Sequence, residues 1–86
     1  MRMMVCAIPF KVTDGTEDFG PFGNTKAIEA VVTLNTKCSP EQREATLVHE
    51  WCHAVLMCNG VSHDEPVVAC LATELYRAGF RVKTED

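Results

Sequence analysis

Residues 39–60 read SPEQREATLVHEWCHAVLMCNG, and this stretch decides the fold of the 86-residue chain. It opens with Ser39-Pro40-Glu41-Gln42, which combines an N-cap serine, a proline at the first helical position and a capping-box glutamine. It closes on Asn59-Gly60, where glycine can take the left-handed conformation that ends many helices. The sequence therefore predicts a helix over residues 40–58.

The centre of this predicted helix carries His49-Glu50-Trp51-Cys52-His53, an H-E-x-x-H sequence. Residues four apart share one face of a helix, about 6 Å apart along its axis, so both imidazoles can bind one zinc ion. Glu50 lies about 100° round the helix, where it can take a proton from a zinc-bound water without being a ligand. The spacing predicts one Zn²⁺ at His49 and His53, with Glu50 as the catalytic base.

A second capping box, Ser62-His63-Asp64-Glu65, predicts another helix that runs to about Ala78-Gly79. The short connection makes the two helices an αα-hairpin, which brings the first turn of the second helix near the last turns of the first. A catalytic zinc usually has three protein ligands and one water. Glu65 is therefore a candidate third ligand.

Other residues compete for this role. Glu74 lies on an apolar stripe of the second helix, where a carboxylate needs a partner. His63 and Asp64 lie at the same corner as Glu65. Capping alone is the alternative interpretation of Glu65, because a glutamate cannot easily cap a helix and bind a metal at once.

Two strands are predicted ahead of the helices, because residues 2–10 are rich in Met, Val and Ile and residues 26–35 alternate with many β-branched types. Glycine and proline turn signals separate them. Residues 80–83 are expected to form a short strand or a tail, and residues 84–86 to fray. The fold class is α+β: one domain over residues 1–86, with a short antiparallel or mixed sheet followed by the helical hairpin.

Composition excludes several classes of protein. The formal net charge is -4 and the eight Lys and Arg are scattered, which argues against a nucleic-acid-binding module. No run of about 20 apolar residues is present, so we expect no membrane span. The five cysteines are odd in number and form no C-x-x-C pair, which predicts reduced thiols and a cytoplasmic protein.

Several motifs match a known family. They are the turn and strand from Phe22-Gly23 to Leu34, the helix start at Ser39, the H-E-x-x-H sequence, and Glu65-Pro66-Val67-Val68. In these features the chain resembles the small zinc metallopeptidases of phages and prophages, of the ImmA/IrrE-like, minimal gluzincin type. The resemblance implies a zincin-like fold, zinc bound by His49, His53 and a glutamate of the next helix, and the host cytoplasm as location. By position that glutamate is Glu65, because it stands just ahead of the Val-Val run.

Together these features predict a peptidase that acts on a protein or peptide substrate of unspecified sequence. The strand over residues 28–34 is expected to be an edge strand that holds an extended peptide or pairs with a second copy in a homo-oligomer. His63 is a candidate oxyanion donor. The alternative function is a zinc-stabilised interaction module on an inactive peptidase scaffold, which a fourth protein ligand such as His63 or Cys52 would favour.

Overall fold

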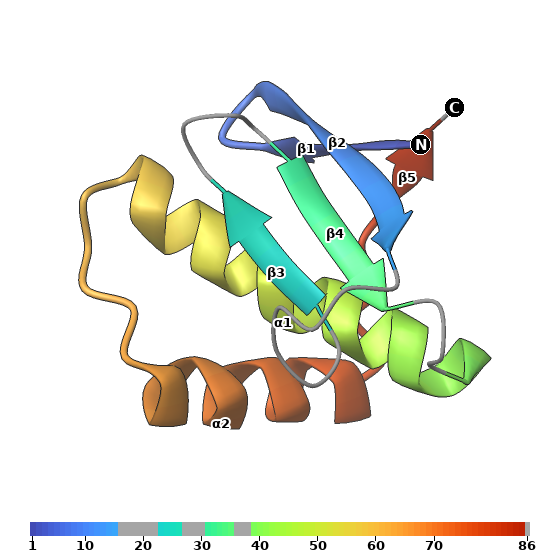
Figure 1. Ribbon diagram of the computed structural model, residues 1–86. Helices are drawn as coiled ribbons and strands as arrows, with labels where there is room; N and C mark the ends of the chain where they lie inside the picture. The colour runs from blue at the N-terminus through green and yellow to red at the C-terminus, as the bar shows by residue number, and fades with distance from the viewer. Residues whose placement is uncertain (16–22, 27–30, 36–38, 86) are drawn as a thin grey trace.

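The computed structural model describes residues 1–15, 23–26, 31–35 and 39–85, and it confirms the α+β fold class. Its elements are β1 (Arg2–Val5), β2 (Ile8–Gly15), β3 (Gly23–Lys26), β4 (Val31–Asn35), α1 (Pro40–Cys58), α2 (Glu65–Arg77) and β5 (Thr84–Glu85). Five strands form one sheet in the order β3-β4-β2-β1-β5 within the described residues (Figure 1). All neighbours are antiparallel except β2 and β4, which are parallel, so the sheet is mixed.

The predicted first strand is wrong in its extent, because the chain reverses at Cys6 and Ala7 to form a hairpin of β1 and β2. Val5 pairs with Ile8 across a two-residue turn. Both turn residues have positive φ angles, 50° and 65°, as a type I′ turn requires. Glycine and asparagine usually mark such turns, so Cys-Ala carried no signal that could predict this one.

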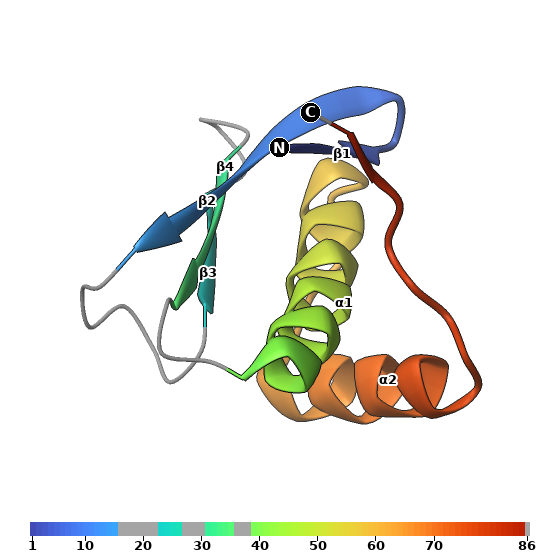
Figure 2. The ribbon, with the colours of Figure 1, turned by 90° about the vertical axis from the view of Figure 1, so that its right-hand side faces the viewer.

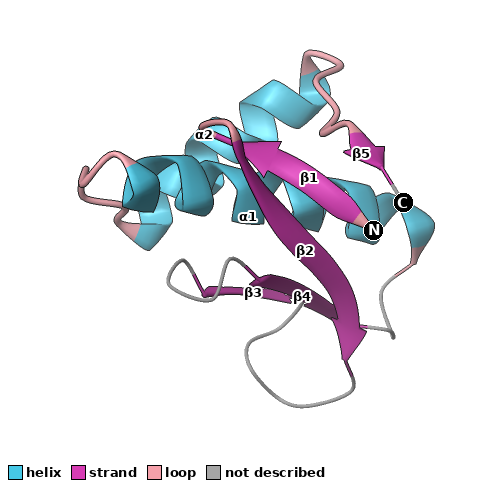
Figure 3. Ribbon diagram, turned by 90° about the horizontal axis from the view of Figure 1, so that it is seen from above, coloured by secondary structure: helices cyan, strands magenta, loops and turns pink. Residues whose placement is uncertain are grey.

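The predicted edge strand also needs correction. The strand β4 lies inside the sheet between β3 and β2, whereas the two outer strands are β3 and β5. The first residues of the predicted 26–35 strand divide between the end of β3 and residues 27–30, which lie outside the described part. At the C-terminus, Thr84 and Glu85 pair with β1 instead of fraying as expected (Figure 3).

The helix α1 has the bounds and the cap that the sequence predicts. Gln42 N–H donates to Ser39 Oγ at 3.2 Å, and Ser39 N–H donates to Gln42 Oε1 at 3.1 Å, so the capping box is complete. At the other end Gly60 has a φ of 67°. The Gly60 and Val61 N–H groups donate to the Met57 and Leu56 carbonyls at 3.1 and 2.9 Å, which closes a Schellman motif.

The helix α2 begins later than its predicted capping box. Its N-cap is Asp64, whose carbonyl accepts the first helical hydrogen bond from Val68 N–H at 3.0 Å. Proline at position 66 explains the shift. A helix capped by Ser62 would need an N–H from residue 66 to the Ser62 carbonyl, and proline has none. Glu65 is therefore the first helical residue and does not complete a box with Ser62.

The helix α1 forms a middle layer between the sheet and α2 (Figure 2). One buried cluster joins the sheet to α1, and Leu47, Trp51 and Val55 pack against its members: Met3, Val5, Phe10, Val12, Val32, Leu34 and Ala54. A second cluster joins the two helices through Val48, Cys52, Val68 and Ala72. His49 and His53 lie on the side of α1 that meets the first turn of α2.

Candidate metal centre

Three of the sequence-predicted ligands come together where α1 meets the first turn of α2. Glu65 places one carboxylate oxygen 2.6 Å from His49 Nε2 and the other 2.8 Å from His53 Nε2. The two histidine Nε2 atoms are 3.2 Å apart. These three side chains form a group that could hold a metal ion, with ligand atoms all within 4.8 Å of one another.

The donor atoms fit a small divalent ion. Ligands at 2.0–2.1 Å from a tetrahedral zinc ion are separated from one another by about 3.3 Å, close to the separation of the two histidine nitrogens. The carboxylate lies nearer to the imidazoles than that, as a direct hydrogen bond requires. A withdrawal of Glu65 by roughly half an ångström would give it the spacing of a zinc ligand.

The exposed fraction of the side chain increases from His53 through His49 to Glu65, so the group is most open to solvent at Glu65. The side chain of His53 is 10% exposed, that of His49 is 24% exposed, and that of Glu65 is 65% exposed. Desolvation acts to raise the pKa of Glu65, but the nearby charge of His49 and the hydrogen bond from His53 outweigh it, so the pKa is lowered. Glu65 is therefore held as a carboxylate, the form that binds a metal.

His63 contacts the far side of the His53 ring. The two Nδ1 atoms are 2.9 Å apart, so one of them donates to the other, and the rings meet edge to face. Since His53 turns its Nε2 atom toward Glu65, its Nδ1 atom is the position from which a second residue fixes a ligating histidine. The structure thus places His63 behind a candidate ligand, a contact that sequence spacing could not reveal because the loop between the helices sets it.

Glu50 is buried on α1, with 7% of its surface exposed. A carboxylate costs free energy to bury unless other groups compensate its charge, and Glu50 does interact with its surroundings. It lies one residue after His49 on a regular helix, so its side chain leaves α1 at about 100° from that histidine. Its placement is compatible with a base beside the metal.

The competing ligand candidates take part in other interactions. Glu74 pairs with Arg77 at 3.3 Å, and its stripe on α2 faces solvent, with Val67 62% and Leu71 48% exposed. Asp64 is the N-cap of α2 and accepts a hydrogen bond from Ser62. Cys52 is buried between the helices, where desolvation raises the pKa of its thiol. Neither Glu74 nor Asp64 nor Cys52 belongs to the described group that could hold a metal ion.

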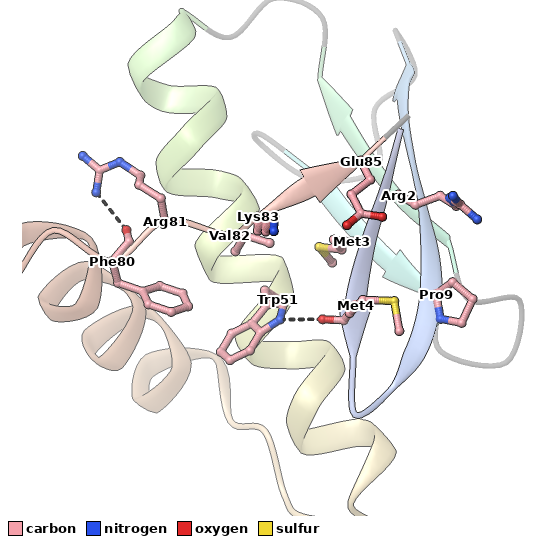
Figure 4. Close-up of a pocket in the computed structure, with 10 residues that line it drawn as sticks. All are labelled: Arg2, Met3, Met4, Pro9, Trp51, Phe80, Arg81, Val82, Lys83 and Glu85. Carbon is pink, nitrogen blue, oxygen red and sulfur yellow. Dashed lines mark hydrogen bonds between the residues drawn. The ribbon is translucent and has the colours of Figure 1, made fainter.

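Trp51 has a packing role. Its indole Nε1–H donates to the Met4 carbonyl at 3.1 Å, and its ring lies 5.2 Å from that of Phe80. These residues line a cavity of about 380 Å³ between β1 and the segment after α2 (Figure 4). Trp51 thus ties α1 to the sheet and holds the helix that carries the histidines.

Comparisons with protein-family models, with curated proteins and with solved structures found no match to this chain. The family resemblance therefore stays a prediction from the motifs. In the part of the chain that the structure describes, neither helix has the length and apolar character needed to cross a membrane.

Proposed function

We propose that this protein is a zinc-dependent peptidase, in which His49, His53 and Glu65 hold the ion and Glu50 is the general base. The observation that carries the proposal is the convergence of two imidazole nitrogens and one carboxylate from two different helices. Two histidines and a carboxylate are a ligand set of catalytic zinc sites, whereas structural sites are closed by four ligands, mostly cysteine and histidine.

The openness of the group supports a catalytic site over a structural one. Among the described residues the group contains three donors. A tetrahedral ion held by three protein ligands keeps one position for water or substrate. Glu65 is the most exposed of the three, so a substrate has access from its side.

In the proposed hydrolysis, the zinc ion and the side chains of the protein have separate roles. Bound zinc supplies Lewis acidity, which lowers the pKa of water to about 7 and polarises a peptide carbonyl. Glu50 takes the proton of the attacking water and passes it to the leaving amine nitrogen. His63 contacts Nδ1 of His53 and would hold that ring with Nε2 toward Glu65, the orientation in which His53 could bind the ion.

An extended peptide is the substrate that the sheet can accept. The strand β3 is an outer strand of the sheet, and it contacts α1, which carries the histidines. A peptide that adds to the side of β3 where no other described strand pairs would gain backbone hydrogen bonds with little regard to its side chains. This role replaces the one expected of β4, whose two sides are both paired.

The decisive experiment is the Glu50→Gln variant, which keeps the size of a buried side chain and removes the base. We expect it to bind one zinc ion per chain by elemental analysis and to lose peptide hydrolysis by at least about 100-fold. Hydrolysis is measured on an unstructured protein by mass spectrometry, with Glu74→Gln as the matched control that stays active. A Glu50→Gln variant as active as its parent would refute the base assignment.

The alternative, a zinc-stabilised interaction module, is favoured by one observation. The outer face of α2 exposes Val67 and Leu71, two large apolar residues four apart on one helix face. Such a face is typical of a helix that meets a partner. Stoichiometric zinc binding without hydrolysis of any peptide pool would favour this alternative over the peptidase.

A further inference from the structure

A pair of thiols meets on the surface between the sheet and the C-terminal end of α1. The turn between β1 and β2 lies over the end of α1, as Figures 1 and 2 both show. The Asn59 side-chain amide at the helix C-cap joins the two by donating to Cys6 Sγ at 3.2 Å and to the Val55 carbonyl at 2.8 Å. Cys6 is thereby held against the residue that follows Cys58.

The thiol of Cys6 is near enough to that of Cys58 to affect its ionisation, and both residues are exposed. The Asn59 amide, on the residue next to Cys58, donates to Cys6 Sγ and fixes this proximity. Partial desolvation and, next to it, the Cys6 sulfur raise the pKa of Cys58, because two adjacent sulfurs resist carrying negative charge together. Of the other described cysteines, Cys52 is buried between the helices and Cys70 is exposed on α2.

We propose that Cys6 and Cys58 are a disulfide-forming pair, which a low-molecular-weight disulfide oxidises into a bond between the β1–β2 turn and the end of α1. With a small disulfide, one cysteine thiolate attacks a sulfur and releases the first small thiol. The second cysteine thiolate attacks the mixed disulfide and releases the second small thiol. Two protons and two electrons leave the protein, one S–S bond forms, and one small disulfide becomes two small thiols.

The bond would link residues far apart in the chain. The closed segment contains β2, β3, β4 and the whole of α1, including both histidines of the candidate metal centre. Closing so long a segment removes much conformational freedom from the unfolded chain. The oxidised protein should therefore melt at a temperature higher by about 10 °C or more, and a reductant should reverse the shift. This inference does not depend on peptidase activity.

The test uses the full chain with oxidised glutathione as the probe. We expect the free thiols in denaturant to fall from five to three, and peptide mapping without reductant to link Cys6 to Cys58. Cys58→Ser should lose the link and the rise in melting temperature. The matched control Cys70→Ser, also at an exposed cysteine, should keep both.

Two outcomes would overturn the proposal. One is a stable glutathione adduct on Cys6 and on Cys58 without a bond between them. The other is a link from either residue to a different cysteine of the same or another chain. Circular dichroism of Cys58→Ser confirms that the variant is folded, so a lost link reports the missing thiol alone.

Discussion

At the scale of single residues, His53 is the centre of the candidate site because both of its ring nitrogens are engaged. Its Nε2 atom contacts Glu65 and its Nδ1 atom contacts His63. A neutral imidazole has one donor and one acceptor nitrogen. In the structure His53 Nε2 donates to the Glu65 carboxylate. A bound ion would need the Nε2 lone pair instead, which His53 keeps if it donates from Nδ1 to His63, so we infer that His63 is a positioning residue.

This arrangement predicts the effect of replacing His63. His63→Phe removes the acceptor behind His53 and should weaken zinc affinity by about 10–100-fold. His63→Asn places an amide oxygen near the position of Nδ1 and should restore most of the affinity. Competition with a chromogenic chelator measures both values. Equal affinity in the parent and the phenylalanine variant would show that His63 does not orient the ligand.

The assignment of the third ligand gives a sharper contrast between two glutamates of the same helix. Glu65→Gln should reduce zinc affinity by more than the roughly 10–100-fold that outer-shell changes cost, because it removes a charged ligand. Glu74→Gln should leave the affinity unchanged, since Glu74 pairs with Arg77 on the exposed side of α2. Calorimetric titration of both variants checks the prediction, which an equal loss in the two would contradict.

The sequence could predict His49 and His53 because one regular helix fixes their relation, and helix geometry follows from spacing. Glu65 lies on the next helix, so helix geometry alone could not predict its position beside the histidines. That prediction depended on the motif resemblance and on the short connection between the helices. Glu74 was a fair competitor only while its stripe was expected to be buried. The contact between His53 and His63 depends on a loop, whose path has no periodic pattern to predict it.

At the scale of elements, the two helices were predictable from their ends, whereas the strands were not. Ser39 and Pro40 mark the start of α1, and Gly60 and Gly79 mark the ends of α1 and α2. The β1–β2 turn lacks the glycine or asparagine that marks a tight hairpin. Alternation of apolar residues continues on both sides of the turn, so residues 2–10 resembled one strand.

The same turn predicts a stabilising substitution. Ala7 has a φ of 65°, a left-handed conformation that costs an L-residue about 1–2 kcal/mol. Glycine pays no such penalty but loses more freedom on folding, so Ala7→Gly should raise the free energy of unfolding by about 0.5–1 kcal/mol. Denaturant unfolding followed by circular dichroism measures the change.

The control is the same replacement inside a helix. Ala45→Gly in α1 should lower the free energy of unfolding by about 1 kcal/mol, because a helix interior disfavours glycine. A loss in Ala7→Gly as large as that in Ala45→Gly would mean that the turn does not hold the left-handed conformation.

At the scale of the whole molecule, the candidate metal centre lies between two helices, α1 and α2, that share a small core. Among the described residues the α1–α2 cluster has four buried members, Val48, Cys52, Val68 and Ala72. A domain of this size buries about 60% of the surface of its unfolded chain, so the loss of a few contacts is a large part of its stability. Glu65 at the start of α2 and the histidines of α1 would let one ion add to the attachment of α2.

We therefore expect zinc removal to lower stability and to loosen α2 first. With free zinc at 100 times its dissociation constant, the bound ion adds about 2.7 kcal/mol, and a chelator should lower the melting temperature by about 10–20 °C. Hydrogen exchange should show lost protection over α2 (Glu65–Arg77) at lower denaturant than over the sheet. Glu65→Gln should abolish the zinc-dependent rise, whereas Glu74→Gln should keep it. If added zinc did not change the melting temperature of the parent protein, the three donors would not bind an ion together. Any ligand that binds only the folded state must stabilise that state.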